Sequence, residues 1–262
     1  MSKRVFLDNA ATTPMAPEII EMMYEMMQTN FANPSSVHSF GRESKIIVEN
    51  ARKTVADLLH TSPGNIFFTS GGTEADNMAI KCAINDHKIT HAITAKLSHH
   101  AVLYPLEDLE KEGVIKLSFI NIDENGVVDL NHLKELLENN PRTFVSIIHA
   151  NNEIGTVADV AGIGKIAHEN DVFFHTDAAQ AVGHIPIDVN TMNIDLMSFS
   201  SHKIYGPKGI GALFVRSLKP RVKLDSIMFG GGQEQNIRSG TLNVPGIVGF
   251  GKAIEIARKD ME

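Results

Sequence analysis

LMSFSSHK, residues 196–203, is the stretch that says most about the fold, and it runs into the glycine-rich turn YGPKG at 205–209. Its first residues are apolar and typical of a buried strand, which then delivers two hydroxyls, an imidazole and an amine to one strand end. Open α/β sheets bind their ligands at the carboxyl ends of the strands. The stretch therefore predicts a polar site at this strand end, with Lys203 as its candidate reactive group.

A second strand-like segment, VFFH at 172–175, ends in Thr176 and Asp177, and Gln180 follows one turn later. Pyridoxal phosphate needs a lysine for its aldehyde and a carboxylate for its ring nitrogen, because the protonated ring withdraws electrons. Taken alone, a lysine after a strand is usually a solvated residue, and an aspartate there often only caps the next helix. The two residues together are the pair that this cofactor requires.

A phosphate site upstream strengthens this interpretation. The strand-like segment IFFTS at 66–70 leads into Gly71 and Gly72, and a helix opens with TEADN at 73–77. Glycines let backbone amides approach an anion, and the free N–H groups at the start of a helix favour a phosphate. The hydroxyl of Thr73 adds a further donor, so this turn is the predicted phosphate cradle.

Helical and strand-like patterns alternate along the chain without a repeat or a low-complexity linker. Helices are predicted at 17–27, 44–60, 74–86, 130–139, 160–169 and 245–260, and strands at 66–70, 91–96, 115–121, 143–150, 172–176, 194–200 and 211–216. Strands separated by helices predict an α/β fold with a mostly parallel, seven-stranded sheet flanked by helices.

Two other chemical interpretations are weaker. GIGKIA at 162–167 fits a dinucleotide fingerprint, but the residues before it look like a helix start rather than a strand, so we expect a helix. Four histidines lie at or near strand ends and could converge on zinc: His99, His149, His175 and His202. Only the neighbours His99 and His100 approach a compact ligand pair, so we expect no metal site.

Composition limits the class of protein. A chain of 262 residues with 43% hydrophobic and 21% charged residues can bury a substantial core as one domain. The net charge of −7 argues against a nucleic-acid partner, which calls for a basic face. The N-terminal apolar run is too short for a signal peptide, and no stretch is long enough to span a membrane. Cys82 is the single cysteine and has no partner for a disulfide, so we expect a cytoplasmic location.

Seven motifs occur in one order along the chain: LDNAATTP (7–14), NPSS (33–36), TSGGTE (69–74), HANNEIG (149–155), HTD (175–177), SHK (201–203) and RSGT (238–241). This series resembles the NifS/IscS-type cysteine desulfurases of the class V aminotransferase superfamily. Those enzymes bind pyridoxal phosphate in a large domain of the aspartate-aminotransferase-like type, fold type I. The resemblance runs from residue 5 to the end of the chain, so it implies the same fold here.

The resemblance also implies a role for each site residue. Lys203 would hold pyridoxal phosphate as a Schiff base, Asp177 would pair with the pyridine nitrogen, and His99 would stack on the ring and transfer protons. The remaining residues would bind the cofactor through hydrogen bonds: Asn152 and Gln180 at the phenolic oxygen, and Gly72, Thr73, Ser200, Ser201 and His202 at the phosphate. Thr241 would reach the phosphate of a neighbouring subunit, which implies a homodimer.

The sequence departs from the family pattern beside His99 and within the phosphate cradle. The family commonly has glutamate before this histidine, and here the residue is Ser98, a change that can alter how the imidazole is oriented. Ser201 replaces a residue that is usually glycine or alanine.

The implied reaction converts L-cysteine to L-alanine and passes the sulfur to a cysteine thiolate, with an iron–sulfur scaffold protein or another sulfur acceptor as partner. In the family, the nucleophilic cysteine and a substrate-binding arginine lie beyond the point where this sequence stops. The sequence ends in the charged run RKDME at 258–262 without a helix-capping signal, which is typical of a truncation. We expect Cys82, on a helix face, not to replace the missing nucleophile.

The domain prediction follows from the same resemblance. Residues 1–15 would form an N-terminal segment associated with the small domain, 16–250 the large cofactor-binding domain, and 251–262 the start of the helix that leads to an absent small domain. Two alternatives stay open. A selenocysteine lyase or another class V aminotransferase-type enzyme would keep Lys203 and Asp177, and a non-catalytic truncated paralogue could act as a scaffold.

Overall fold

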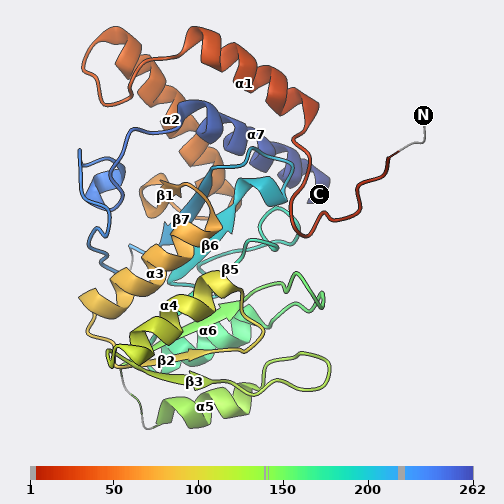
Figure 1. The fold of residues 1–262 in the computed structure, drawn as a ribbon, viewed down its shortest axis with the longest axis vertical. Coiled ribbons are helices and arrows are strands. Elements are labelled where there is room, and N and C mark those ends of the chain that lie inside the picture. The colour runs from red at the N-terminus through yellow and green to blue at the C-terminus, as the bar shows by residue number, and fades with distance from the viewer. Residues whose placement is uncertain (1–3, 139, 141, 218–221, 262) are drawn as a thin grey trace.

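The computed structural model describes residues 4–138, 140, 142–217 and 222–261. Its centre is a seven-stranded sheet in the order β1-β7-β6-β5-β4-β2-β3 (Figure 1). The strands are β1 (Ile66–Thr69), β2 (His91–Thr94), β3 (Lys116–Phe119), β4 (Thr143–Ile148), β5 (Phe173–Asp177), β6 (Leu196–Ser200) and β7 (Gly211–Val215). All run parallel except β7, which lies antiparallel between β1 and β6. The predicted mostly parallel seven-stranded sheet is confirmed.

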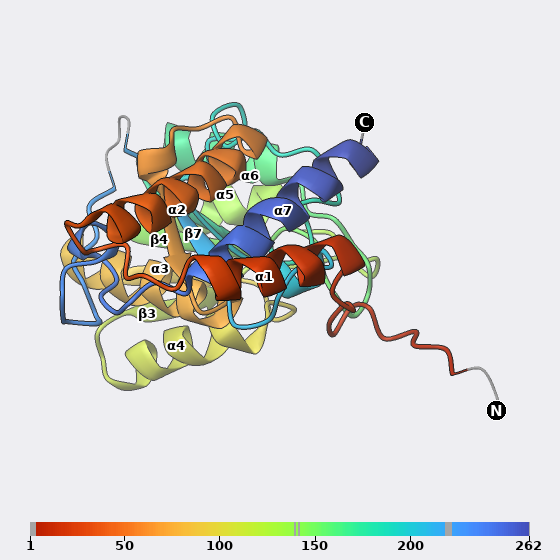
Figure 2. The same cartoon turned by 90° about the horizontal axis from the view of Figure 1, so that it is seen from above.

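Helices cover both faces of the sheet. They are α1 (Pro17–Thr29), α2 (Ser39–Leu58), α3 (Gly72–Asp86), α4 (His100–Lys111), α5 (Leu130–Glu138), α6 (Val160–Glu169) and α7 (Val244–Met261). Figure 2 shows α3 and α4 on the opposite side of the sheet from α2 and α6. The buried side chains accordingly form two apolar clusters, one with α3 and α4 and the other with the remaining helices. GIGKIA lies within α6, as predicted, and does not follow a strand.

The helix α4 was not predicted from the sequence. Pro105 lies inside it, and a proline normally ends or kinks a helix because it lacks the N–H of a turn. Here Val102, Leu106 and Leu109 pack into the apolar cluster on the α3 side of the sheet, and this burial outweighs the missing hydrogen bond. The helix α2 also begins earlier than expected, because the side chain of His38 caps it by accepting from the Gly41 N–H.

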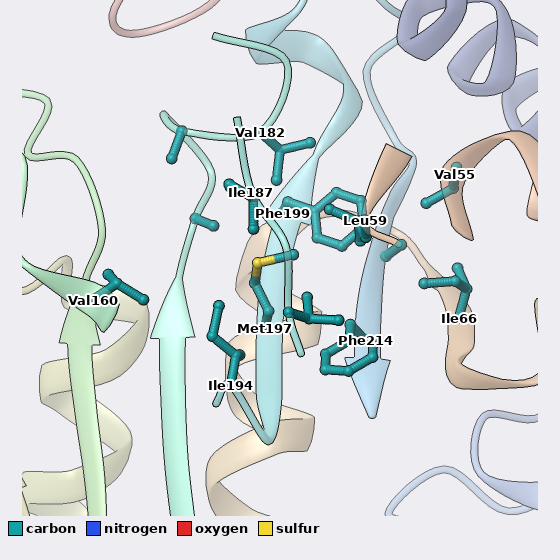
Figure 3. Close-up of a cluster of buried hydrophobic side chains, with 14 of the residues drawn as sticks. Val55, Leu59, Ile66, Val160, Val182, Ile187, Ile194, Met197, Phe199 and Phe214 are labelled. Atoms are coloured by element: carbon teal, nitrogen blue, oxygen red, sulfur yellow. The ribbon is translucent and has the colours of Figure 1, made fainter. Parts of the chain in front are cut away.

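The strand β6 is buried on both faces. Its Met197 and Phe199 face the larger cluster together with Phe214 of β7, and Leu59 lies near them (Figure 3). Leu196, on the other face, packs into the cluster with α3 and α4. Because both faces are packed, the strand holds its C-terminal end, and the residues that follow, in a defined position.

The helix α7 runs without a break across residue 250, where the sequence analysis placed a boundary. Its Phe250, Ala253 and Ile254 are fully buried, and the helix packs against α1 and α2 (Figure 2). The division into segments 1–15, 16–250 and 251–262 stays a prediction. No helix within the described part of the chain combines the length and the apolar character needed to cross a membrane.

Candidate active site

The carboxyl ends of the parallel strands meet in a pocket with a volume of about 320 Å³. Its lining includes every predicted site residue except Ser201 and Thr241: Gly72, Thr73, His99, Asn152, Asp177, Gln180, Ser200, His202 and Lys203. Asp177 and Ser200 end β5 and β6, and the other residues lie in the segments that follow β1, β2, β4, β5 and β6. A cavity of this size is within the range of small-molecule and cofactor sites.

Lys203 ends a short 3₁₀ turn that follows β6 directly. Its Nζ donates hydrogen bonds to the backbone carbonyl oxygens of Ala10 and Ala11, the second at 3.0 Å. Burial lowers the pKa of Lys203, and the negative charges of Asp177 and Asp8 oppose this shift. A lowered pKa raises the fraction of neutral amine, which is the form that attacks a carbonyl carbon.

The N-terminal segment covers one side of this pocket, and the sequence analysis assigned it no role in the site. Besides binding Lys203, the carbonyl of Ala10 accepts a hydrogen bond from Gln180 Nε2 at 2.7 Å. Thr12 and Thr13 contact His202, through its ring nitrogen at 3.0 Å and its carbonyl oxygen at 2.9 Å. Backbone carbonyls carry no side-chain signature, so the contribution of Ala10 and Ala11 could be found only in the structure.

Asp177 is the last residue of β5 and is 4% exposed. Its Oδ1 accepts a hydrogen bond from the Ala179 N–H at 3.0 Å. Burial raises the pKa of this carboxyl, while the Ala179 N–H and the charges of His99 and Lys203 lower it. The strand and its neighbours thus hold a desolvated carboxyl group at the pocket floor.

Asp76 is a second buried carboxyl that the sequence analysis treated only as part of a helix opening. It is 2% exposed, lines the pocket and lies one turn after Gly72 and Thr73 in α3. Burial raises its pKa well above the usual range, the charge of Asp177 raises it further, and a hydrogen bond from Ser198 opposes both. Because residues four apart share a helix face, the spacing from Gly72 to Asp76 is the sequence signal that could have found it.

His99 caps the N-terminus of α4, where its Nδ1 accepts a hydrogen bond from the Ala101 N–H at 3.1 Å. In the neutral ring the proton is then on Nε2, which is the nitrogen left to exchange a proton with a ligand. The departure at Ser98 does not supply a hydrogen bond to this ring. The Ser98 hydroxyl is instead buried beside Thr94 Oγ1, at 3.0 Å.

The turn between β1 and α3 has the features of an anion site. Ser200 lines the pocket beside Gly72 and Thr73, and within the described residues its buried hydroxyl has no hydrogen-bond partner. An adjoining cavity of about 370 Å³ shares these three residues and His202, and adds Lys208 as a positive charge. The close packing behind the turn requires Gly211, since an added Cβ there would lie 2.7 Å from the backbone of Gly71.

Ser201 and Thr241 lie outside the main pocket. Ser201 is fully buried, and its hydroxyl also lacks a partner among the residues that the structure describes. Thr241 is exposed on a loop that is held near α3 by the ion pair of Arg238 with Glu74, at 2.7 Å. Ser201 was predicted to bind the phosphate of its own subunit, and Thr241 the phosphate of a neighbouring subunit. Both roles stay predictions.

The four histidines considered for zinc do not converge in the described part of the chain. Within the described residues, one set of three potential metal ligands has its ligand atoms within 4.8 Å of one another. It consists of Asp76, His99 and Asp177. His175 instead hydrogen-bonds Ser146 and Ser198 inside the sheet, at 2.8 and 2.9 Å. The three clustered side chains all line the pocket described above, and the absence of a metal site stays a prediction.

The fold and the site define a protein class that sequence comparison identifies directly. Residues 5–262 match the aminotransferase class-V family, so the chain belongs to this family, whose members depend on pyridoxal phosphate. It is 47% identical, over its whole length, to the cysteine desulfurase IscS of Dictyoglomus turgidum, and spans 66% of that relative.

Solved structures give the same result. A NifS-like protein superposes with a TM-score of 0.94 at 38% identity, over 99% of this chain and 71% of the other. The protein SspA, solved in complex with cysteine, superposes with a TM-score of 0.91 at 40% identity, over 96% of this chain and 72% of the other. The expected family and the expected fold type are therefore confirmed.

Proposed function

We propose that the protein is a pyridoxal-phosphate-dependent cysteine desulfurase, which converts L-cysteine to L-alanine and passes the sulfur to an acceptor thiol. The observation that carries the proposal is the convergence of Lys203, Asp177 and the phosphate-type turn at Gly72 on one pocket. The protein would act in the cytoplasm as a homodimer, and it would serve iron–sulfur cluster assembly together with a scaffold protein. Support for these points comes from the likeness to IscS-type relatives.

The residues of the pocket fit the cofactor in charge and in hydrogen-bonding capacity. The unpartnered hydroxyl of Ser200, the first amides of α3 and the charge of Lys208 match a phosphate. The buried carboxyl of Asp177 matches a pyridine nitrogen, and the amine of Lys203 matches an aldehyde. Asn152 and Gln180 line the same pocket and would bind the phenolic oxygen.

When bound, pyridoxal phosphate supplies a ring that withdraws electrons from the substrate Cα. The chain supplies the groups that orient the reaction and move protons. Asp177 keeps the ring nitrogen protonated because it offers a carboxylate in a site shielded from water. His99 and Lys203 are the two pocket residues suited to carry the proton between the substrate and solvent. The Ala10 and Ala11 carbonyls hold the Lys203 amine at the pocket.

The acceptor thiol lies outside the 262 residues of this chain. Cys82 is their single cysteine and is 2% exposed in α3, where burial raises its pKa to about 12. A thiol with this pKa is protonated at neutral pH and is therefore a poor nucleophile. The sulfur would thus go to a cysteine beyond residue 262 or to a partner protein.

The test is reduction with borohydride in the presence of pyridoxal phosphate, followed by peptide mapping. Covalent label is expected on the peptide that contains Lys203, and Lys203→Ala should carry none. Lys208→Ala is the matched control, because it removes a neighbouring amine and should keep the label. Label on Lys208 in the wild-type protein would overturn the assignment.

Substrate choice needs a second assay, because a selenocysteine lyase or another class V aminotransferase-type enzyme would use the same lysine and aspartate. Products should be compared after incubation with L-cysteine, L-selenocysteine and keto acids, with an added thiol as sulfur acceptor. Alanine from L-cysteine supports the proposal. Activity confined to selenocysteine or to keto acids would replace it, and failure to take up pyridoxal phosphate would favour the non-catalytic scaffold.

A further inference from the structure

The pocket floor holds two buried carboxyl groups from different elements, Asp76 of α3 and Asp177 of β5. They are 2% and 4% exposed, and each has an oxygen within 4.8 Å of the other. Within the described residues, Asp76 Oδ1 is buried without a hydrogen-bond partner. Two carboxylates so close in a desolvated site repel each other, which favours the binding of a proton by one of them.

The surroundings of the two carboxyls decide which one keeps the proton. Asp177 accepts the Ala179 N–H and lies in the field of the cationic forms of His99 and Lys203, all of which favour its ionised form. A ring nitrogen of His99 also lies within 4.8 Å of an Asp76 oxygen, but the Ala179 N–H and the charge of Lys203 act on Asp177 and not on Asp76. Its carboxyl faces the Ser198 hydroxyl and the ring of His175, whose Nε2 is 3.6 Å from Oδ1.

His175 does not supply a positive charge to Asp76. Its ring is fully buried, and burial lowers its pKa to about 3, so it is neutral at physiological pH. Its two nitrogens bind Ser146 and Ser198, which gives a continuous line of neutral groups across β4, β5 and β6 below Asp76. This line suits a protonated acid and not a carboxylate.

We infer that Asp76 is a positioning residue: it holds the single proton of the buried pair and leaves Asp177 as the one carboxylate of the pocket floor. The protonation is a property of the folded chain by itself. Its consequence, that Asp177 is free to pair with a pyridine nitrogen, rests on the proposed function.

Infrared spectroscopy of the cofactor-free protein tests the protonation directly. With aspartate labelled by ¹³C at the carboxyl carbon, the wild-type protein at pH 8 should show the band of a buried protonated acid, and Asp76→Asn should lose it. Asp195→Asn is the matched control, because Asp195 is also buried but its raised pKa of about 6 leaves it ionised at this pH. Absence of the band in the wild type, or its persistence in Asp76→Asn, would overturn the inference.

The consequence for Asp177 has a separate readout, the ¹⁵N chemical shift of bound pyridoxal phosphate labelled at the ring nitrogen. Asp76→Asn should keep the protonated-pyridine shift and a dissociation constant within about threefold of the wild type, because amide and acid are both neutral. Asp177→Asn should lose that shift. Loss of the shift in Asp76→Asn as well would mean that Asp76 is the ionised partner. If no variant binds the cofactor, the proposed function fails, while the infrared result still decides the protonation.

Discussion

Asp177 and Glu234 are both buried acids, but they differ in how far other groups of the chain compensate their charge. Glu234 is 7% exposed, and its carboxylate accepts two hydrogen bonds from Arg52 and one from the Phe68 N–H, all at 2.7 Å. Asp177, at 4% exposed, has one backbone donor and another carboxyl beside it. The first site is internally satisfied and so stabilises the fold. The carboxyl at the second site is free to bind a ligand, and a group from outside the chain must compensate part of its negative charge.

The Arg52–Glu234 pair also holds an unusual backbone. Glu234, Gln235 and Asn236 have φ values of 47°, 56° and 67°, in the left-handed region that non-glycine residues rarely occupy. Consecutive residues in this region persist only where surrounding contacts hold them. The ion pair therefore anchors the loop that leads to Arg238 and Thr241.

The strongest test of this comparison is to break the satisfied pair. Glu234→Gln should lower the free energy of unfolding by about 3–5 kcal/mol, because it leaves the Arg52 guanidinium buried without its counter-charge. Urea unfolding followed by circular dichroism measures the change. Glu49→Gln is the control, since the side chain of this other partner of Arg52 is 49% exposed and its loss should change little. A stable Glu234→Gln protein would show that the pair is not the anchor.

The opposite result is expected at Asp177. Asp177→Asn should keep the protein folded with no loss of stability, because it removes a buried and poorly compensated acid. Exchange of the substrate Cα proton with solvent should fall about 10- to 100-fold, the loss of a charge-assisted hydrogen bond to the ring. Proton exchange is measured by NMR in deuterated water with L-cysteine or L-alanine. Unchanged exchange would mean that another group tunes the cofactor.

The pH dependence of stability tests the raised pKa of Asp76. The folded-state pKa of Asp76 is raised by burial, so the folded protein binds more protons than the unfolded chain between the unfolded value of 3.8 and the folded value. Stability should therefore decrease as the pH rises through this window, and the decrease should be smaller in Asp76→Asn. Urea unfolding of the cofactor-free proteins from pH 4.5 to 8 measures both slopes. Equal slopes would contradict a raised pKa at Asp76.

Two buried histidines act in the opposite direction but do not obscure this comparison. Burial lowers the pKa values of His149 and His175 to about 4 and about 3. Each histidine therefore makes the folded protein less stable as the pH falls below 6.5. Both residues are present in the wild type and in Asp76→Asn. Their contribution cancels in the difference between the two slopes.

The smallest effect is expected at Cys82. Cys82→Ala should leave cofactor binding and alanine formation unchanged and lower the free energy of unfolding by only about 1 kcal/mol, the loss of a small buried side chain. In the folded wild type, iodoacetamide at pH 8 should modify this thiol far more slowly than in urea. Rapid labelling of the folded protein, or loss of alanine formation in the variant, would make Cys82 a candidate nucleophile.

The sequence by itself determined the sheet and the reactive pair of this protein. Alternating strand and helix patterns predicted the α/β fold, and placing Lys203, Asp177 and Gly72 at or just beyond strand ends predicted that they meet. That inference works because the carboxyl ends of parallel strands lie along one edge of a sheet, whatever the helices do. Such features depend on local pattern and on a general rule of chain topology.

Tertiary structure alone decided the rest, because it depends on which distant surfaces pack together. The helix α4 forms despite Pro105 since the sheet offers an apolar surface to bury. The strand β7 enters between β1 and β6 in the antiparallel sense, which no local pattern shows. Asp76 lies close to Asp177, about 100 residues further along the chain. The Ala10 carbonyl accepts a hydrogen bond from Lys203, about 190 residues away. Burial and electrostatic coupling arise only when such segments come together, so their effects on the pocket are properties of the folded molecule.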